Sequence, residues 1–250
     1  MGLTTGSKSQ YPNLFQNCVL WWPGSHSSGY TSDIDEFPIV PSGVTATNNG
    51  TWTKTDLGNN KSVLNFDGIS NYISLTTNSA WNFGSSNFTI SFWYKPVSIV
   101  SGAICGHKWD NRSWIIYQYS DGKIEFDLST IGSSGWSYTI TSPIGSIVTT
   151  DWMFFTIVRS GSNVIIYKLG TSIASSNSVS GSLYSSSNPL QIGADIDTST
   201  VYRINGNIKD LMIWNGKVLS QAEIKMLMIK THPITGTGLM FGPQSYWRLS

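Results

Sequence analysis

Apolar and polar residues alternate along most of this chain, in short runs that turn sequences separate. In the run NFTISFWYKP, alternate side chains fall on one face of an extended strand, because successive strand residues point to opposite sides. These side chains are Phe88, Ile90, Phe92 and Tyr94. Pro96 is expected to end the strand, because proline has no backbone N–H to donate. A long series of such runs predicts an all-β fold, with two antiparallel sheets packed as a sandwich.

Three turn sequences predict hairpins between neighbouring strands. Asp67-Gly68 lies between VLNF and YISL, and Asp121-Gly122 lies between SWIIYQY and GKIEFDLS. Residues 160–162 join the two β-rich runs of DWMFFTIVRSGSNVIIYKLG. Glycine tolerates a positive φ and aspartate satisfies nearby backbone groups, so both residue types favour tight turns.

One short helix is predicted near the C-terminus, in LSQAEIKMLMIK. Ser220 is a good N-cap, and Glu223 three residues later completes a capping box that satisfies two backbone N–H groups. Ile224, Met226 and Leu227 give the helix an apolar side, and Lys230 suits its C-terminal end. The preceding Ser-rich stretch, SIASSNSVSGSLYSSSNP, is interpreted as an edge strand with loops within one domain.

The composition limits the classes of partner. Charged residues make up 12% of the chain, against roughly 25% in typical globular proteins, so Ser, Thr, Asn and Gly must form most of the surface. The net charge is +1 and no basic run occurs, which argues against a nucleic-acid partner. No stretch approaches the ~20 apolar residues of a membrane span, and MGLTTGSKSQYPN lacks a secretory signal's apolar core. We therefore expect no membrane insertion and no classical signal peptide.

The two cysteines, Cys18 and Cys105, each lie in an apolar run. This setting favours buried free thiols, and a disulfide between them is the alternative.

The order of motifs carries a specific resemblance. NCVLWWPG is followed by SVLNFDGISNYISL, NFTISFWYKP and SDGKIEF, and then by DWMFFTIVRSGSNVIIYKLG, NPLQIGAD and INGNIKDLMIWNGKVLSQAEIKML. This series, from Cys18 to Leu227, resembles the laminin-G-like, concanavalin A-like jelly rolls, in the branch related to pentraxins. The resemblance implies a two-sheet jelly roll that recognises glycans or protein surfaces, sometimes through calcium at one rim.

Three segments are expected along the chain. Residues 1–16 form an N-terminal arm, residues 17–230 form the jelly-roll domain, and residues 231–250 form an apolar C-terminal tail. Phe241, Tyr246 and Trp247 in this tail are predicted to contact another subunit. The alternative is that the tail packs on its own sandwich and covers a sheet edge.

Sugar binding would use exposed aromatic rings with amide and hydroxyl groups nearby. GHKWDNRSW places Trp109 beside Asp110 and Asn111, and SSGWSY adds Trp136 and Tyr138. These five residues are the candidate glycan contacts, although most tryptophans of such a chain belong to the core.

Calcium binding would need several oxygen ligands from loops. Asp67 with Asn71 is the candidate site, and the alternative role of Asp67 is that of a turn residue alone. Other candidate calcium ligands, each also in an ordinary turn sequence, are Asp33, Asp35, Glu36, Asp195 and Asp197.

A glycoside hydrolase would need two carboxyl groups about 5–10 Å apart. IEFDLST supplies Glu125 and Asp127 on one face of a strand, as in the Glu-x-Asp-x-x-Glu strand of concanavalin A-like glucanases. Thr130 stands at the third acidic position, so this residue set favours a protein that is not an enzyme.

Together these features predict a non-catalytic, lectin-like recognition and structural protein. The first hypothesis is a virion-surface subunit of the decoration, fibre or host-attachment type, with other subunits of an oligomeric assembly and glycans as partners. It would be located at the virion surface or outside the cell. The alternatives are a stand-alone carbohydrate-binding module of a cellular protein and a degenerate glycoside hydrolase.

Overall fold

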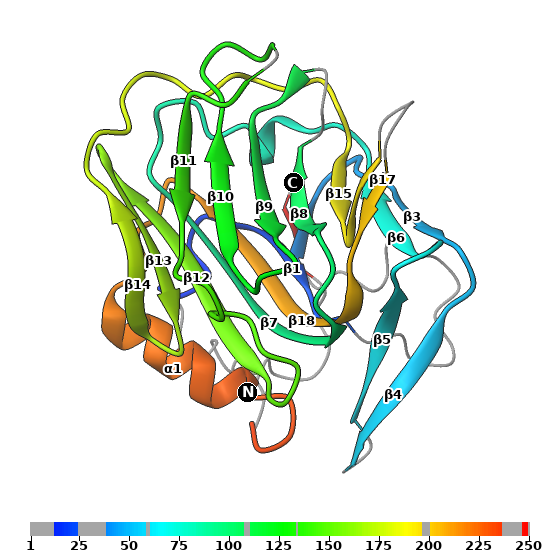
Figure 1. Ribbon diagram of the computed structural model, residues 1–250. Helices are drawn as coiled ribbons and strands as arrows, with labels where there is room; N and C mark the ends of the chain where they lie inside the picture. The colour runs from blue at the N-terminus through cyan, green and yellow to red at the C-terminus, as the bar shows by residue number, and fades with distance from the viewer. Residues whose placement is uncertain are drawn as a thin grey trace, which may run out of the picture.

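The computed structural model consists of two antiparallel sheets packed face to face, with one helix, α1 (Gln221–Thr231), beside them (Figure 1). This confirms the predicted all-β jelly-roll sandwich with a short helix near the C-terminus. The structure describes residues 13–24, 39–58, 61–107, 111–133, 135–196, 201–236 and 247–249.

The larger sheet, sheet A, has ten strands. Its order is β14 (Thr171–Ser176), β13 (Asn163–Lys168), β12 (Met153–Ser160), β7 (Phe88–Ser98), β18 (Asn205–Asn215), β1 (Cys18–Trp22), β2 (Ile39–Pro41) and β19 (Trp247–Leu249). The first half of β18 also pairs with β5 (Lys61–Asp67), which pairs in turn with β4 (Thr53–Gly58).

The second sheet, sheet B, has nine strands. Its order is β11 (Tyr138–Thr141), β10 (Ile124–Leu128), β9 (Trp114–Gln118), β8 (Gly102–His107), β15 (Leu190–Ile192), β6 (Tyr72–Leu75) and β3 (Ala46–Asn49). A small pair, β16 (Ala194–Ile196) and β17 (Val201–Arg203), joins it where β17 runs parallel to β8. A short 3-10 turn, η2 (Ser79–Trp81), follows β6.

The core between the sheets is built from the alternating side chains. The predicted inward face of β7 is confirmed, because Phe88, Ile90, Phe92 and Tyr94 all belong to this core. The ring of Phe92 lies 5.7 Å from that of Phe155 on the neighbouring β12. Burial of such large rings supplies much of the stability of a sandwich.

The predicted hairpin around Asp67-Gly68 is wrong, although both strands exist. β5 pairs within sheet A and β6 pairs within sheet B, so the turn carries the chain from one sheet to the other. The local sequence specified the turn. The pairing partners, β18 for β5 and β15 for β6, come from distant parts of the chain.

Pro96 does not end its strand, which continues to Ser98. Pro96 lies opposite Gly206, next to a register shift between Asn205 and Gly206 of β18. A missing N–H is tolerated beside a bulge because the ladder is already interrupted there.

The other local predictions hold. β9 pairs with β10 across the turn that contains Asp121-Gly122, and β12 pairs with β13. The Ser-rich stretch contributes edge strand β14. The capping box at Ser220 and Glu223 is present.

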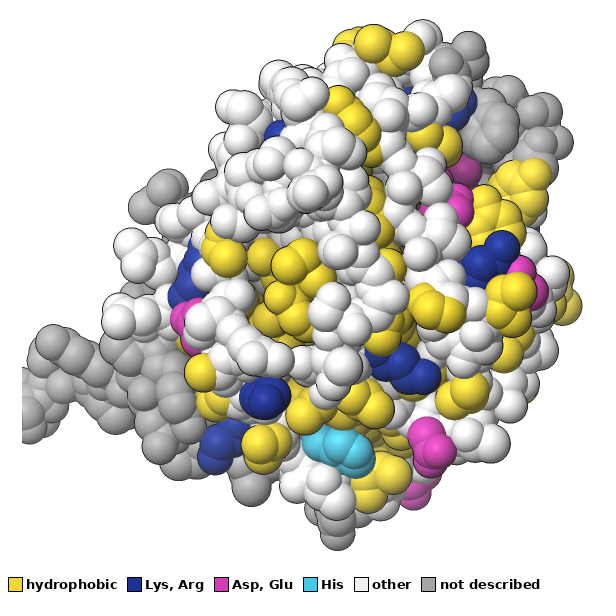
Figure 2. All heavy atoms as spheres, turned by 60° about the vertical axis from the view of Figure 1, so that its left-hand side comes forward, with side chains coloured by type: hydrophobic (Ala, Val, Ile, Leu, Met, Phe, Trp, Pro, Cys, Tyr) yellow, Lys and Arg dark blue, Asp and Glu magenta, His cyan; other side chains and the backbone are white. Residues whose placement is uncertain are grey.

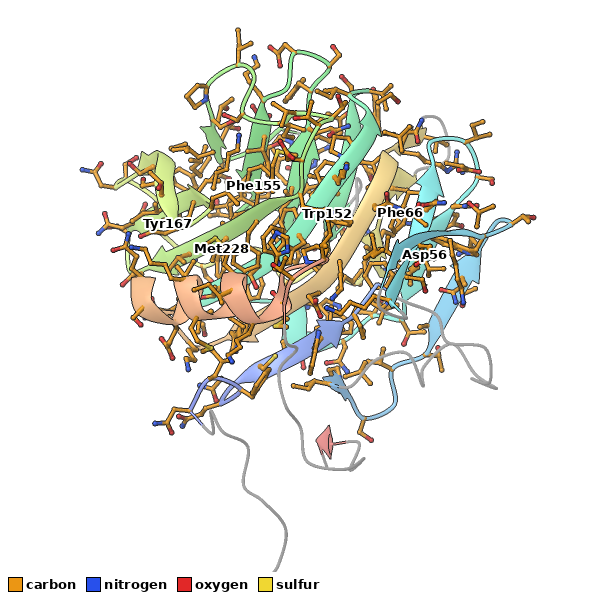
Figure 3. The ribbon with its side chains drawn as sticks, turned by 90° about the horizontal axis from the view of Figure 1, so that it is seen from below. Asp56, Phe66, Trp152, Phe155, Tyr167 and Met228 are labelled. Carbon is orange, nitrogen blue, oxygen red and sulfur yellow. The ribbon has the colours of Figure 1, made fainter. Side chains whose placement is uncertain are left out.

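A second apolar layer covers the outer face of sheet A (Figure 3). There α1 packs Ile224 and Leu227 against the sheet, and Figure 3 shows the helix with Met228 lying across the strands. Trp93 of β7 donates a hydrogen bond from its indole N–H to the Thr231 hydroxyl, 2.8 Å away. By contrast, no helix in the described part of the chain covers the outer face of sheet B.

Cys18 and Cys105 are both buried free thiols, as predicted, and burial raises the pKa of each. In the part of the chain that the structure describes, no helix has the length and apolar character of a membrane span. Figure 2 shows a surface of mostly uncharged polar groups with scattered apolar side chains, in keeping with the low charge content.

Candidate functional site

A hollow of about 230 Å³ lies on the outer face of sheet B, over β8, β9 and β10 and beside the β16–β17 pair (its strands can be followed in Figure 1). Aromatic and acidic side chains form most of its wall. The lining residues are His107, Ile115, Tyr117, Tyr119, Asp127, Trp136, Asp195 and Tyr202.

Strand alternation places the two tyrosines from the β9 region in this hollow. Trp114 and Ile116 of β9 point into the core, so Tyr117 points to the outer face, and Tyr119 follows two residues later. The Tyr117 and Tyr119 rings lie 5.1 Å apart with an interplanar angle of 61°. An edge-on pair of this kind exposes ring faces in different directions.

The same alternation places two carboxylates on β10. Glu125 and Asp127 are separated by the core residue Phe126 and lie on the outer face. Tyr119 donates its hydroxyl hydrogen to Glu125 at 2.8 Å. Asp127 accepts a hydrogen bond from Thr139 at 2.6 Å.

The β16–β17 pair closes one side of the hollow with Asp195 and Tyr202, which are opposite one another in that pair. The Tyr202 ring lies 5.6 Å from the Tyr117 ring, at 75°. On another side, the Arg112 guanidinium lies over the Trp136 ring, 4.9 Å from its centroid. The hollow therefore combines ring faces with carboxylate oxygens from separate segments.

The environment changes the acidity of these groups. Burial, reinforced by the neighbouring Glu125 carboxylate, raises the pKa of Asp127 to about 7. Burial and nearby acidic groups also raise the pKa of Tyr117 and of Tyr119. The His107 ring packs 5.8 Å from Trp114 on the core side, and burial lowers its pKa to about 3, so it is neutral at pH 7.

Replacing Asp127 with asparagine should stabilise the protein at pH 8 by about 1–2 kcal/mol and change little at pH 4. The folded-state pKa of about 7 lies above the unfolded value of about 3.9. The folded state therefore holds the proton more tightly, and the free energy of unfolding falls as the pH rises from about 4 to about 7. Asparagine removes the buried charge and keeps an oxygen that can accept from Thr139. Urea unfolding at both pH values measures the effect.

Asp151→Asn is the control for this prediction, because Asp151 is exposed in the bend just before β12. Its effect should be small at both pH values. If Asp127→Asn changes the free energy of unfolding equally at pH 4 and pH 8, the pKa of Asp127 is not raised by burial.

Of the predicted glycan contacts, the structure places Trp136 in the hollow. Tyr138 lies elsewhere, packed against the core with its hydroxyl 2.9 Å from that of Ser180. Asn111 is half-buried, and its side chain donates to the Ser187 hydroxyl at 3.4 Å. Trp109 and Asp110 lie outside the described residues.

The predicted calcium ligands Asp67 and Asn71 are engaged with their own turn. Asp67 accepts hydrogen bonds from the backbone N–H groups of Ile69, Ser70 and Asn71 and from the Ser70 hydroxyl. Burial opposes ionisation here, but these hydrogen bonds outweigh it and lower the pKa of Asp67. These hydrogen bonds explain the role of Asp67 as a turn residue. Calcium binding by Asp67 and Asn71 stays a prediction.

No group of three or more His, Cys, Asp or Glu side chains within the described ranges is arranged to hold a metal ion. Of the other acidic candidates, Asp195 lines the hollow, whereas Asp33, Asp35, Glu36 and Asp197 lie outside those ranges.

In the predicted subunit-contact tail, Phe241 and Tyr246 also lie outside the described residues. The backbone of Trp247 begins β19, which pairs in parallel with β2 of the same chain. This pairing corresponds to the alternative, in which the tail packs on its own sandwich and covers a sheet edge. Contact with another subunit stays a prediction.

Sequence reasoning did not assign Tyr117, Tyr119 and Tyr202 to the site. Tyr117 and Tyr119 fall two residues apart in SWIIYQY, on the strand face opposite that of Trp114 and Ile116, so a shared outward position could have been inferred from the sequence. The position of Tyr202 opposite them depends on the parallel contact of β17 with β8, which no local pattern specifies.

The sequence matches a laminin-G-type family model, described as the concanavalin A-like lectin/glucanases superfamily, over residues 67–225. The match covers more than half of the 250 residues, and the chain therefore belongs to this superfamily. The resemblance inferred from the motifs is thus confirmed, while the pentraxin-related branch stays a prediction. No curated protein matches the sequence.

Several solved structures are similar in fold. The binding domain of Paraclostridial mosquitocidal protein 1 has a TM-score of 0.66 and 17% identity, with 87% of this chain and 53% of that chain covered. The binding domain of botulinum neurotoxin serotype C1 has a TM-score of 0.63 and 18% identity, with 88% and 53% covered. A botulinum neurotoxin type C structure, whose description states that cell entry depends on two ganglioside molecules, has a TM-score of 0.62 and 19% identity, with 89% and 53% covered. The chain thus spans about half the length of these proteins.

Proposed function

We propose that this protein is a glycan-recognition domain and that the hollow on the outer face of sheet B is its binding site. The observation that carries the proposal is the arrangement of Tyr117, Tyr119 and Tyr202 around a cavity that also holds Asp127 and Asp195. Aromatic rings stack on the C–H faces of sugar rings, and carboxylates accept hydrogen bonds from sugar hydroxyls. The volume of about 230 Å³ is below the ≈ 300–1,000 Å³ of typical ligand pockets, which suits one or two sugar rings.

The similar structures support a binding role. Two are described as binding domains, and the description of a third states that cell entry of botulinum neurotoxin type C depends on interaction with two ganglioside molecules. Another is described as the binding domain of botulinum neurotoxin DC in complex with rat synaptotagmin II. Since each similarity covers about half of the other chain, the named ligands belong to those proteins, and the hollow itself carries the proposal here.

A glycan array tests this function. The wild-type protein should bind a defined set of glycans, and Tyr202→Ala and Trp136→Ala should each lose that binding. Tyr167→Ala is the matched control because Tyr167 packs on the outer face of sheet A, on the other side of the sandwich (labelled in Figure 3). Array binding that survives both hollow variants, or that only Tyr167→Ala removes, would contradict the site.

We expect no hydrolysis of bound glycans. A retaining glycosidase needs its two carboxyl groups about 5–5.5 Å apart, and an inverting enzyme needs a wider gap for water. Glu125 and Asp127 instead accept hydrogen bonds from Thr141 and Thr139, and Thr130 stands at the third acidic position of the glucanase strand. Incubation with β-glucans and other polysaccharides should release no reducing ends. Release that disappears in Glu125→Gln would establish the alternative of a glycoside hydrolase.

We propose that this domain is located at the surface of a virion or a comparable assembly. Residues 231–250 would contact another subunit there. A surface of mostly uncharged polar side chains supports an exposed, particle-bound role (Figure 2). Deletion of Gly238–Ser250 should reduce incorporation into the native assembly. Incorporation at wild-type levels would contradict the subunit contact and favour a stand-alone carbohydrate-binding module.

A further inference from the structure

The floor of the hollow is a short stretch of the outer face of sheet B. Ile115 of β9 lies directly opposite Asp127 of β10 and opposite Gly106 of β8, and Tyr117 follows two residues later on the same face. Gly106 has no side chain. A Cβ atom there would lie only 2.7 Å from the Ile115 Cα, so no larger residue fits without moving the backbone. The floor is therefore low beside Ile115.

An aromatic wall stands at one end of this floor. Trp114 pairs with Leu128 at the end of β9 and β10. Just beyond this pair, the Ser137 N–H donates to the Leu128 carbonyl oxygen at 2.8 Å, which places Trp136 at the end of β10. The Arg112 guanidinium lies over the Trp136 ring, 4.9 Å from its centroid. This stacked pair closes the hollow at one end of the strands.

The turn that joins β9 to β10 closes the opposite end. Tyr119 donates its backbone N–H to the Lys123 carbonyl oxygen at 3.0 Å and its hydroxyl hydrogen to Glu125 at 2.8 Å. The Lys123 ammonium group lies 5.5 Å from the centroid of the Tyr119 ring. These contacts hold the Tyr119 ring at the margin of the hollow. Together with Trp136, it blocks both directions along the strands.

A third wall stands on the side of β8. There β17 runs parallel to β8, and the Tyr202 ring lies 5.6 Å from the Tyr117 ring at 75° (Figure 1 shows β17 beside β8). Asp195 lies opposite Tyr202 in the β16–β17 pair and lines the same side of the hollow.

The fourth side, over β11, is the low one. Thr139 lies opposite Asp127, and Thr141 lies opposite Glu125. The hydroxyl groups of these two exposed threonines donate to the carboxyl groups at 2.6 and 2.7 Å, which holds both short side chains against β10. Among the described residues that line the hollow, none belongs to β11. The edge of sheet B at β11 is therefore the open side.

Resting on the proposed glycan-binding function, we propose that the hollow recognises the non-reducing terminal sugar of a glycan, whose chain leaves over Thr139 and Thr141. A sugar inside a linear chain carries a glycosidic bond on each side and needs two exits, whereas three walls leave one. The terminal ring lies between Trp136, Tyr119 and Tyr202. Its end is the non-reducing one because the reducing end of a glycan is joined to its carrier.

A glycan array with matched pairs tests this class. Each pair presents the same glycan with and without one further sugar attached to its non-reducing end. The glycans that bind the wild-type protein should share one terminal sugar, and the added sugar should weaken binding about tenfold, because it collides with a wall.

A variant of β11 tests the exit. Thr141→Tyr places a ring on the open side and should weaken binding of a trisaccharide that binds on the array about tenfold. The methyl glycoside of its terminal sugar should keep its affinity within about twofold, because it has no chain to leave the hollow. Calorimetric titration measures both. Thr141→Val is the matched control, since it removes the hydroxyl without adding bulk, and it should leave both affinities unchanged.

The outcomes separate this inference from the proposed function. Equal binding of the extended and unextended members of the pairs overturns terminal recognition and leaves glycan recognition standing. If Thr141→Tyr weakens neither probe, or weakens the trisaccharide and the methyl glycoside equally, the exit over β11 is wrong. The absence of binding to every glycan of the array overturns the proposed function itself.

Discussion

Replacing Phe92 with alanine should lower the free energy of unfolding by about 3–5 kcal/mol. Phe92 is 0% exposed at the centre of β7, with neighbours in both sheets' shared core and the Phe155 ring 5.7 Å away. Its removal loses the transfer free energy of a whole ring and leaves a cavity that flanking strands, held in two ladders, cannot close. Denaturant melts measure the loss through the transition midpoint.

Val97→Ala is the control on the same strand. Val97 is 66% exposed, so its truncation should change stability by no more than about 0.5 kcal/mol. A Phe92→Ala loss below 1 kcal/mol would contradict the assignment of this face of β7 to the core.

Replacing Arg159 with methionine should cost about 2–4 kcal/mol. Arg159 lies near the end of β12 and is 3% exposed. Its guanidinium donates hydrogen bonds to the carbonyl oxygens of Gly84, Gly161 and Gly181 at 3.0–3.1 Å, which ties three loops together. Burial lowers the pKa of this group, yet the three carbonyls hold its protons in place.

Methionine keeps most of the volume and leaves those carbonyls without their donor. Arg159→Lys should be intermediate, since an ammonium group cannot reproduce the planar fork. Lys225→Met on the exposed side of α1 is the control for removing a positive charge. If Arg159→Met is no more destabilising than Lys225→Met in the same melts, the three hydrogen bonds do not stabilise the fold.

The strands were predictable because alternation and turn residues are local properties. The runs around Phe92, the turn at Asp121-Gly122 and the capping box at Ser220 each needed only a few neighbouring residues, and all are present. The pairing of β5 and β6 was not predictable in this way. The same Asp-Gly turn serves a hairpin or a crossing between sheets, and the choice depends on partners such as β18.

The candidate site shows the same division. The outward position of Glu125 and Asp127 follows from period-2 alternation and is confirmed. The sequence could not show that Asp127 is only 4% exposed, because that burial comes from neighbours on other strands. The sequence also could not show that Tyr202 contacts Tyr117. These two residues lie far apart in the chain and meet because β17 runs beside β8.

The most direct test of the central claim is an NMR titration of the isotopically labelled protein with a glycan that it binds on the array. The proposed site predicts that the largest shift changes fall on the amides of Tyr117, Tyr119 and Tyr202 and on the indole N–H of Trp136. Amides in α1 and on the outer face of sheet A should remain unchanged. Changes concentrated on α1, on the β4–β5 hairpin or around Asp67, with the β9, β10 and β17 signals unmoved, would contradict a binding site on the outer face of sheet B.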